Sequence, residues 1–173
     1  MHFKKDKTMK LINLLFIALS IAALPLAASE KADNDVVKVV YQCDFPEPDR
    51  VHLMLNTIKN ATEYYDKNFI QYEVDIVALG PCLQYVMKDF NKTGFEEKPY
   101  ITKGGPTGAG TRSRLKGLQL TGGDKIKIYA CKNTMDNNHV SEKQIEDFAT
   151  ITLAGIVKII DLERNGYAYI KIK

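Results

Sequence analysis

The chain has 173 residues, with 24 Lys and Arg against 21 Asp and Glu, which gives a net charge of +3 at pH 7. The excess lies in the first 29 residues, because without them the basic residues fall to 20 and the acidic residues to 20. A nucleic-acid-binding protein needs positive charge clustered on its folded part. The neutral segment 30–173 therefore predicts no nucleic-acid partner, and its length suits one domain with its own hydrophobic core.

The N-terminal residues have the three parts of an export signal. Four lysines precede the apolar run 11–24, and the small residues 27–29 follow it. The run is short for a bilayer span, which takes about 20 residues. We therefore predict a signal peptide at 1–29, a single domain at 30–173, and a periplasmic or secreted protein without membrane contact after cleavage. A retained membrane anchor is the alternative.

Apolar patterning predicts that strands and helices alternate along the domain. Runs rich in β-branched residues predict strands at 36–41, 72–79, 125–131 and 167–172. Capping residues and helical spacing predict helices at 49–68 and 81–89, near Leu115 and Leu118, from 141, and at 155–165. Residues 91–111, with five glycines, predict a long loop.

The stretch 155–165 also fits a strand of a hairpin that turns at Asn165-Gly166, but its apolar spacing favours a helix with Gly166 as the C-cap. The alternation of elements predicts the α/β class, as a three-layer α/β/α domain with a mainly parallel sheet.

Three cysteines follow or end predicted strands: Cys43, Cys82 and Cys131. In a parallel sheet this places all three at the carboxyl edge, where reactive groups gather. An odd count leaves at least one thiol unpaired or paired between chains. Cys82 follows Pro81 in the first turn of a predicted helix, where a thiolate is favoured. For each cysteine, a buried inert thiol is the alternative.

Four segments together resemble the DsrE/DsrF-like (YchN-like) sulfur-relay family. They are Arg-Val-His-Leu-Met-Leu-Asn-Thr-Ile at 50–58 after the first strand, Val-Asp-Ile-Val-Ala-Leu-Gly-Pro at 74–81, Ile-Tyr-Ala-Cys-Lys-Asn-Thr-Met at 128–135, and the ending from Gly155 to Gly-Tyr-Ala-Tyr-Ile at 166–170. The resemblance implies a sheet of about five strands, assembly into homotrimers or homohexamers, and a cysteine after the third strand that carries persulfide sulfur. That cysteine corresponds to Cys131. Sulfur donor and acceptor proteins, or small sulfur compounds, would be the partners.

On this hypothesis Cys131 is the carrier, Cys82 or Cys43 assists or resolves, and Lys132 with Asn133 shapes the anionic intermediate. Persulfide exchange needs a thiolate that a partner can reach, so we expect the Cys131 sulfur to meet solvent. The reaction needs no organic cofactor. No Cys or His spacing supports a metal site, and we predict none.

Two other functions stay open. A glycine-rich loop with Gly104, Gly105, Gly108, Gly110 and Arg112 predicts a backbone nest for a small anion in a non-enzymatic binding module, with an ordinary loop as the alternative. Such a module could equally bind a partner protein. A thiol–disulfide redox protein is the third possibility, and a cycling disulfide between Cys43 and Cys82 would support it.

Overall fold

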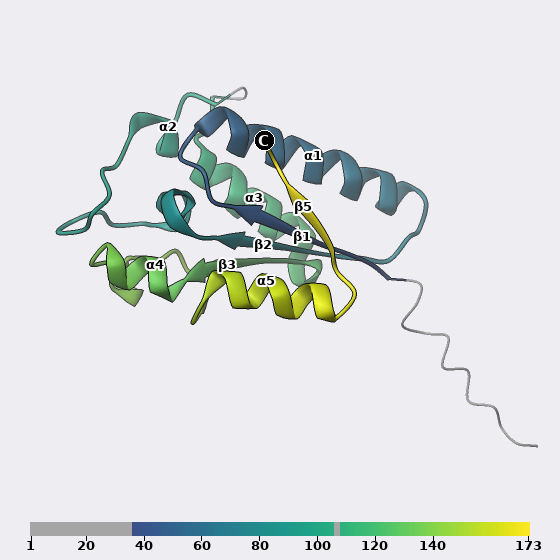
Figure 1. The fold of residues 1–173 in the computed structure, drawn as a ribbon. Coiled ribbons are helices and arrows are strands. Elements are labelled where there is room, and N and C mark those ends of the chain that lie inside the picture. The colour runs from purple at the N-terminus through teal and green to yellow at the C-terminus, as the bar shows by residue number, and fades with distance from the viewer. Residues whose placement is uncertain (1–35, 106–107) are drawn as a thin grey trace, which may run out of the picture. The chain divides into compact units, whose positions relative to one another are not determined.

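The computed structural model describes residues 36–105 and 108–173, so the predicted signal peptide at 1–29 lies outside the described residues. The described chain forms a five-stranded, all-parallel sheet (Figure 1). The strands are β1 (Val37–Cys43), β2 (Tyr72–Ala78), β3 (Ile126–Cys131), β4 (Ala149–Thr152) and β5 (Ala168–Lys171). Their order across the sheet is β4-β3-β2-β1-β5. The predicted α/β/α class is confirmed.

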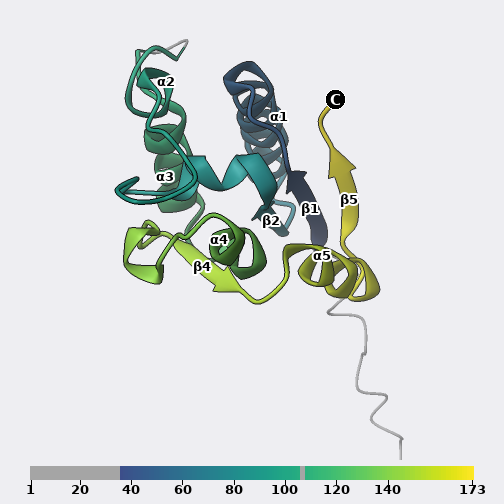
Figure 2. The ribbon, with the colours of Figure 1, turned by 60° about the vertical axis from the view of Figure 1, so that its left-hand side comes forward.

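Helices cover both faces of this sheet, as Figures 1 and 2 show. α1 (Pro48–Lys67) and α3 (Thr111–Gly122) pack on one face, and α5 (Gly155–Arg164) packs on the other. Crossovers between parallel strands are right-handed. Because β4 and β5 lie at opposite edges, the connection between them runs back across the sheet and places α5 on the second face.

Alternate side chains of each strand enter two hydrophobic cores. In β1, Val39 and Tyr41 belong to the larger core under α1 and α3, whereas Val40 packs with Ile159 and Leu162 of α5 in the smaller one. Full burial of one such aliphatic side chain stabilises the fold by about 1.5–3 kcal/mol. The α5 face, with the smaller core, is therefore held by fewer buried apolar groups.

Short helical segments connect these elements. They are η1 (Gly80–Val86), α2 (Pro99–Thr102), η2 (Gly123–Lys125), α4 (Lys132–Asn137) and η3 (Glu142–Gln144). Pro81 lies in the first turn of η1, as the sequence predicts, because its missing N–H costs nothing there. The long loop expected at 91–111 is wrong in part, because α2 forms within it and buries Ile101 in the larger core.

The helix predicted from residue 141 is wrong beyond its first turn. Ser141 and Gln144 form a capping box, which is a genuine helix-start signal. The chain then becomes extended at Ile145, which bridges to Met87, and continues into β4. Tertiary pairing with β3 overrides the local helical preference of this segment.

Candidate functional site

Two of the three cysteines are bonded to each other. Cys43, the last residue of β1, forms a disulfide with Cys82 in η1, and their Cα atoms lie 5.6 Å apart. This separation is ordinary for a disulfide. Both residues are buried, with 0% and 1% of their surface exposed. Neither is therefore a free thiol in this structure, and the role of Cys82 or Cys43 in assisting Cys131 or resolving its intermediate stays a prediction.

The sheet separates this disulfide from Cys131. Cys43 and Cys82 belong to the larger core under α1 and α3. Cys131 shares a strand face with Tyr129, which packs against the smaller core, and it contacts Gly155 at the start of α5. Neither half of the disulfide can reach Cys131 unless the sheet rearranges.

Cys131 ends β3 at the point where the connections change faces. The chain that leaves β3 enters α4, whose Met135 lies in the larger core. The chain that leaves β4 enters α5 on the opposite face. In open parallel sheets, ligands and reactive groups gather at such a switch point, beyond the carboxyl ends of the strands. The predicted position of Cys131 at this edge is confirmed.

The Cys131 sulfur accepts a hydrogen bond from the backbone N–H of Gly155, with 3.1 Å between N and Sγ. Gly155 is the first residue of α5, so the positive end of that helix faces the sulfur. A Cβ at Gly155 would lie 3.2 Å from the Cβ of Cys131, which is tighter than ordinary van der Waals contact. The close approach therefore depends on glycine. A backbone donor at a helix start is the setting in which proteins stabilise anionic sulfur.

The expectation that this sulfur meets solvent is wrong, because Cys131 is 4% exposed. The segment 152–154, between β4 and α5, lies beside it: Thr152 pairs with Cys131 across the sheet, and the Leu153 carbonyl accepts a hydrogen bond from the Asn133 N–H at 3.2 Å. The Leu153 side chain itself is 81% exposed. The outer side of the segment borders a hollow of about 410 Å³.

The two polar residues after Cys131 have contacts of their own. Lys132 forms an ion pair with Asp136 one turn along α4. Asn133 is exposed, and its backbone N–H donates a hydrogen bond to the Leu153 carbonyl. Neither side chain hydrogen bonds to the sulfur, within the part of the chain that the structure describes. Their role in shaping an anionic intermediate stays a prediction.

Arg112, the cation predicted to serve the glycine-rich loop, is not free. The Arg112 guanidinium donates to the Met87 carbonyl at 2.9 Å and lies 3.5 Å from the carboxylates of Glu97 and Glu146. These contacts give Arg112 a structural role, because its charge is already matched.

Gly104 and Gly108 have positive φ angles of 91° and 79°. A side chain at Gly110 would overlap the Ile101 carbonyl, and one at Gly105 would crowd His52. An anion nest here stays a prediction, and residues 106–107 lie outside the description.

The sequence matches the DsrE/DsrF-like family over residues 35–172. The chain belongs to this family. Membership indicates a role related to sulfur relay. Among solved structures, five chains match. One is a protein of unknown function from Methanobacterium thermoautotrophicum, with 16% sequence identity and a TM-score of 0.57 over 78% of this chain and 98% of that chain. That likeness concerns the fold. No curated protein matches.

The α5 face of this DsrE/DsrF-like protein also holds a polar cluster that the sequence analysis missed. Asp75 of β2 is 2% exposed, and burial raises its pKa from 3.8 to about 6, against the opposing effect of Lys127 and Lys158. Asp75 hydrogen bonds to Tyr129, whose pKa burial raises to about 12. The Lys158 ammonium lies 4.3 Å from the centre of the Tyr129 ring. The sequence feature that could have indicated this cluster is an acidic residue inside the apolar run 74–79.

Two further findings concern residues 36–105 and 108–173 alone. No three His, Cys, Asp or Glu side chains among them are grouped so as to hold a metal ion. None of their helices is long and apolar enough to span a membrane.

Proposed function

We propose that this protein is an exported persulfide carrier in a sulfur-relay or sulfur-oxidation pathway, with Cys131 as the residue that accepts and passes on sulfane sulfur. Family membership supports the sulfur chemistry. The observation that carries the proposal is the placement of a reduced thiol at the switch point of the sheet, with the Gly155 N–H on its sulfur. The proposed export rests on the signal-peptide pattern of residues 1–29.

Loading of the carrier is an exchange reaction. The Cys131 thiolate attacks the outer sulfur of a donor persulfide or polysulfide, a Sγ–S bond forms, the donor S–S bond breaks, and its electron pair leaves on the donor thiolate. The acceptor thiolate then attacks the outer sulfur of the Cys131 persulfide in the same way. Neither step needs a metal or an organic cofactor. The Gly155 N–H stabilises the Cys131 thiolate before it is loaded and again after it has passed its sulfur on.

Cys131 is buried, and we propose that access to its sulfur requires movement of the segment 152–154, which lies beside it. The segment holds few side chains in the core: Leu153 is exposed, and β4 is a four-residue edge strand. Local opening of weakly packed edge segments costs much less than global unfolding. We propose that a docked donor or acceptor displaces this segment and exposes the thiol.

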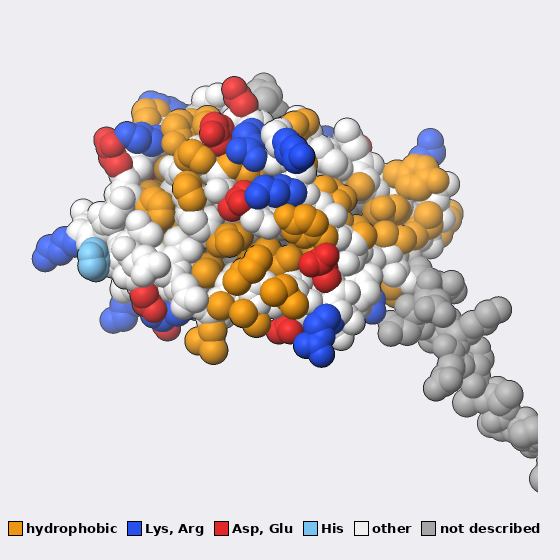
Figure 3. Space-filling view, viewed as in Figure 1, with side chains coloured by type: hydrophobic (Ala, Val, Ile, Leu, Met, Phe, Trp, Pro, Cys, Tyr) orange, Lys and Arg blue, Asp and Glu red, His pale blue; other side chains and the backbone are white. Residues whose placement is uncertain are grey.

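The same face of the molecule suits association. Ile156, Val157 and Ile160 of α5 are exposed and form an apolar patch, visible below the centre of Figure 3. Exposed apolar patches of this kind mark protein interaction sites. We propose that α5 contributes to assembly into the expected homotrimer or homohexamer, next to the Cys131 segment. Sedimentation of the protein and of an Ile160→Glu variant tests this, because the charged variant should dissociate.

Intact mass spectrometry tests the carrier. After incubation with inorganic polysulfide and removal of the excess, the protein should gain the mass of one sulfur atom that dithiothreitol removes. The Cys131→Ser variant should gain nothing, while loss of the disulfide in a Cys43→Ala/Cys82→Ala variant should leave the gain intact. A sulfur adduct that survives in Cys131→Ser would contradict the assignment.

The proposed displacement of the segment 152–154 can be tested separately. Gly155→Ala introduces a Cβ 3.2 Å from that of Cys131 and should push the start of α5 outward. We expect Cys131 to react with an alkylating reagent faster in this variant than in the unchanged protein, at concentrations of urea too low to unfold either. Equal alkylation rates would show that the segment does not limit access.

A binding module of the same fold is the second candidate, and the burial of Cys131 favours it. On this hypothesis Cys131 is a packing residue and its thiol is inert. The protein would then take up no sulfur from polysulfide even in Gly155→Ala, and Cys131→Ala would keep the binding of its partner. The redox alternative is weaker, because both sulfurs of the disulfide are buried.

A further inference from the structure

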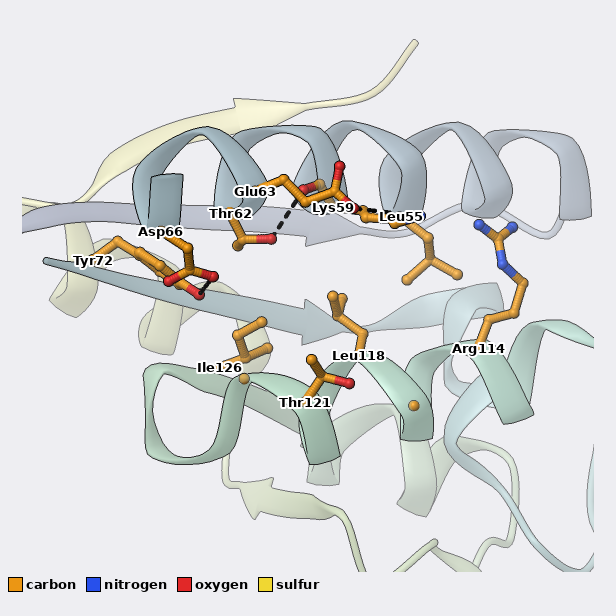
Figure 4. Close-up of a pocket in the computed structure, with 12 residues that line it drawn as sticks. Leu55, Lys59, Thr62, Glu63, Asp66, Tyr72, Arg114, Leu118, Thr121 and Ile126 are labelled. Carbon is orange, nitrogen blue, oxygen red and sulfur yellow. Dashed lines mark hydrogen bonds and ion pairs between the residues drawn. The ribbon is translucent and has the colours of Figure 1, made fainter. Parts of the chain in front are cut away.

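A groove runs between α1 and α3, on the face of the sheet away from Cys131 (Figure 4). Its volume is about 300 Å³, at the lower end of the range for small-molecule sites. Leu55 and Leu118 point into it from the two helices, and Ile126 and Tyr72 lie at its far end. The centre of the groove is therefore apolar, and its rim is polar.

Gly117 keeps this groove open. It lies inside α3, where glycine costs about 1 kcal/mol relative to alanine. No atom lies within 4 Å of the place where its Cβ would stand, so packing does not require glycine here. By contrast, a Cβ at Gly122 or Gly110 of the same region would collide with neighbouring atoms. Glycine at position 117 therefore lowers the stability of the helix although no packing contact requires it. Its missing side chain leaves the groove open at this point.

Arg114 stands at one end of the groove without a carboxylate partner. Its guanidinium donates to Nδ1 of His52 and to Oδ1 of Asn56, the latter at 2.7 Å. Both partners are neutral, since a ring nitrogen that accepts from arginine carries no proton. Burial, and then the charge of Arg114, lower the pKa of His52. No carboxylate among the described residues lies within 4 Å of Arg114.

The other charges along the rim are matched within the protein. Lys59 lies 3.4 Å from Glu63 on α1, and Asp66 lies 3.4 Å from Lys125. Arg114 is thus the groove-lining cation whose partners leave its charge uncompensated. A partly buried cation without a counter-charge favours an anionic ligand, and guanidinium pairs best with a carboxylate.

We propose that this groove binds a small amphipathic carboxylate, with its carboxylate on Arg114 and its apolar chain across Gly117 between Leu55 and Leu118. From Arg114 to Gly122, α3 rises about 12 Å, which suits a medium-length acyl chain. The site lies on the opposite face of the sheet from Cys131 and does not depend on sulfur carrying.

The test compares octanoate with octanol, which share the apolar chain and differ in charge. Amide shifts in two-dimensional NMR of the protein, followed during titration, should map both ligands to α1 and α3. Octanoate should bind about tenfold more tightly than octanol, because a hydrogen bond to a charged group adds at least this much. Arg114→Gln should abolish the preference and leave octanol binding unchanged. Lys116→Gln, an exposed change on the same helix, should alter neither affinity.

Gly117→Leu fills the groove and should abolish binding of both ligands. Gly117→Ala serves as the milder variant, because it should strengthen the helix while weakening both ligands severalfold. Equal affinity of octanoate and octanol would overturn the proposal, as would shifts confined to the apolar patch of α5. Binding to vesicles of anionic lipid without binding of free octanoate would also overturn it, since the occupant would then be a membrane surface.

Discussion

The disulfide between Cys43 and Cys82 should supply a large share of the stability of this domain. It closes a loop with a sequence separation of 39 residues. Loop-closure entropy for a link of this length corresponds to about 4 kcal/mol at 25 °C. Domains of this size are stable by about 5–15 kcal/mol in total. The reduced protein should therefore unfold at a much lower urea concentration than the oxidised protein.

Urea unfolding followed by circular dichroism measures this difference. The experiment uses Cys131→Ser as the common background, because a free thiol would exchange with the disulfide in the unfolded chain. Oxidised and reduced samples of this variant should differ by about 4 kcal/mol in unfolding free energy, and the reduced sample should have the larger m-value, since its unfolded state exposes more surface. A difference below about 1 kcal/mol, with the bond verified by mass, would refute the loop-entropy reasoning.

Three substitutions test other features. Because burial raises the pKa of Asp75 to about 6, the folded protein keeps a proton that the unfolded chain loses near 3.8. The retained proton stabilises the folded state; this stabilisation is complete below pH 3.8 and is lost as the pH rises through 6. Between pH 4 and pH 7 the unfolding free energy of the unchanged protein should therefore fall by up to about 3 kcal/mol relative to that of Asp75→Asn. Urea unfolding at pH 4 and pH 7 measures this, and an equal difference between the two proteins at both pH values would contradict it. The lowered pKa of His52 changes stability with pH in the opposite direction, but it does so in both proteins and cancels in the comparison. Gly110→Ala should destabilise the protein by about 2 kcal/mol or more, because its Cβ would overlap the Ile101 carbonyl. Gly117→Ala should instead stabilise the protein by about 1 kcal/mol, because no atom opposes its Cβ. The melting temperatures of the two variants distinguish these outcomes.

The fold followed from the sequence where local pattern and tertiary structure agree. β1, β2, α1 and α5 appear close to their predicted ranges because each has an apolar periodicity that matches its burial. β4 could not be found in this way. Its four residues at the edge of the sheet alternate little in burial, and a capping box at Ser141 indicated a helix instead. Pairing with β3, which the local pattern does not contain, decides the outcome.

The candidate site was predictable in position and not in environment. A cysteine at the end of a strand is visible in the sequence, so Cys131 was placed correctly at the carboxyl edge. Its burial depends on Gly155, which lies 24 residues further along the chain and approaches only through the packing of α5. Likewise, three cysteines allow three pairings, and the choice of Cys43 with Cys82 depends on a distance that the sequence does not contain.

The burial of Cys131 and its distance from the disulfide have a common consequence for a protein exported as we propose. A thiol is oxidised, or exchanges with a disulfide, only when a reaction partner can reach its sulfur. In this structure the Cys131 sulfur is buried beside the start of α5, and the sheet keeps the Cys43–Cys82 sulfurs on its other face. A carrier thiol can thus stay reduced in an oxidising compartment without a dedicated reductant. Its rate of sulfur transfer would then depend on how often the start of α5 moves away, and a partner that promotes this movement would also determine which molecules receive the sulfur.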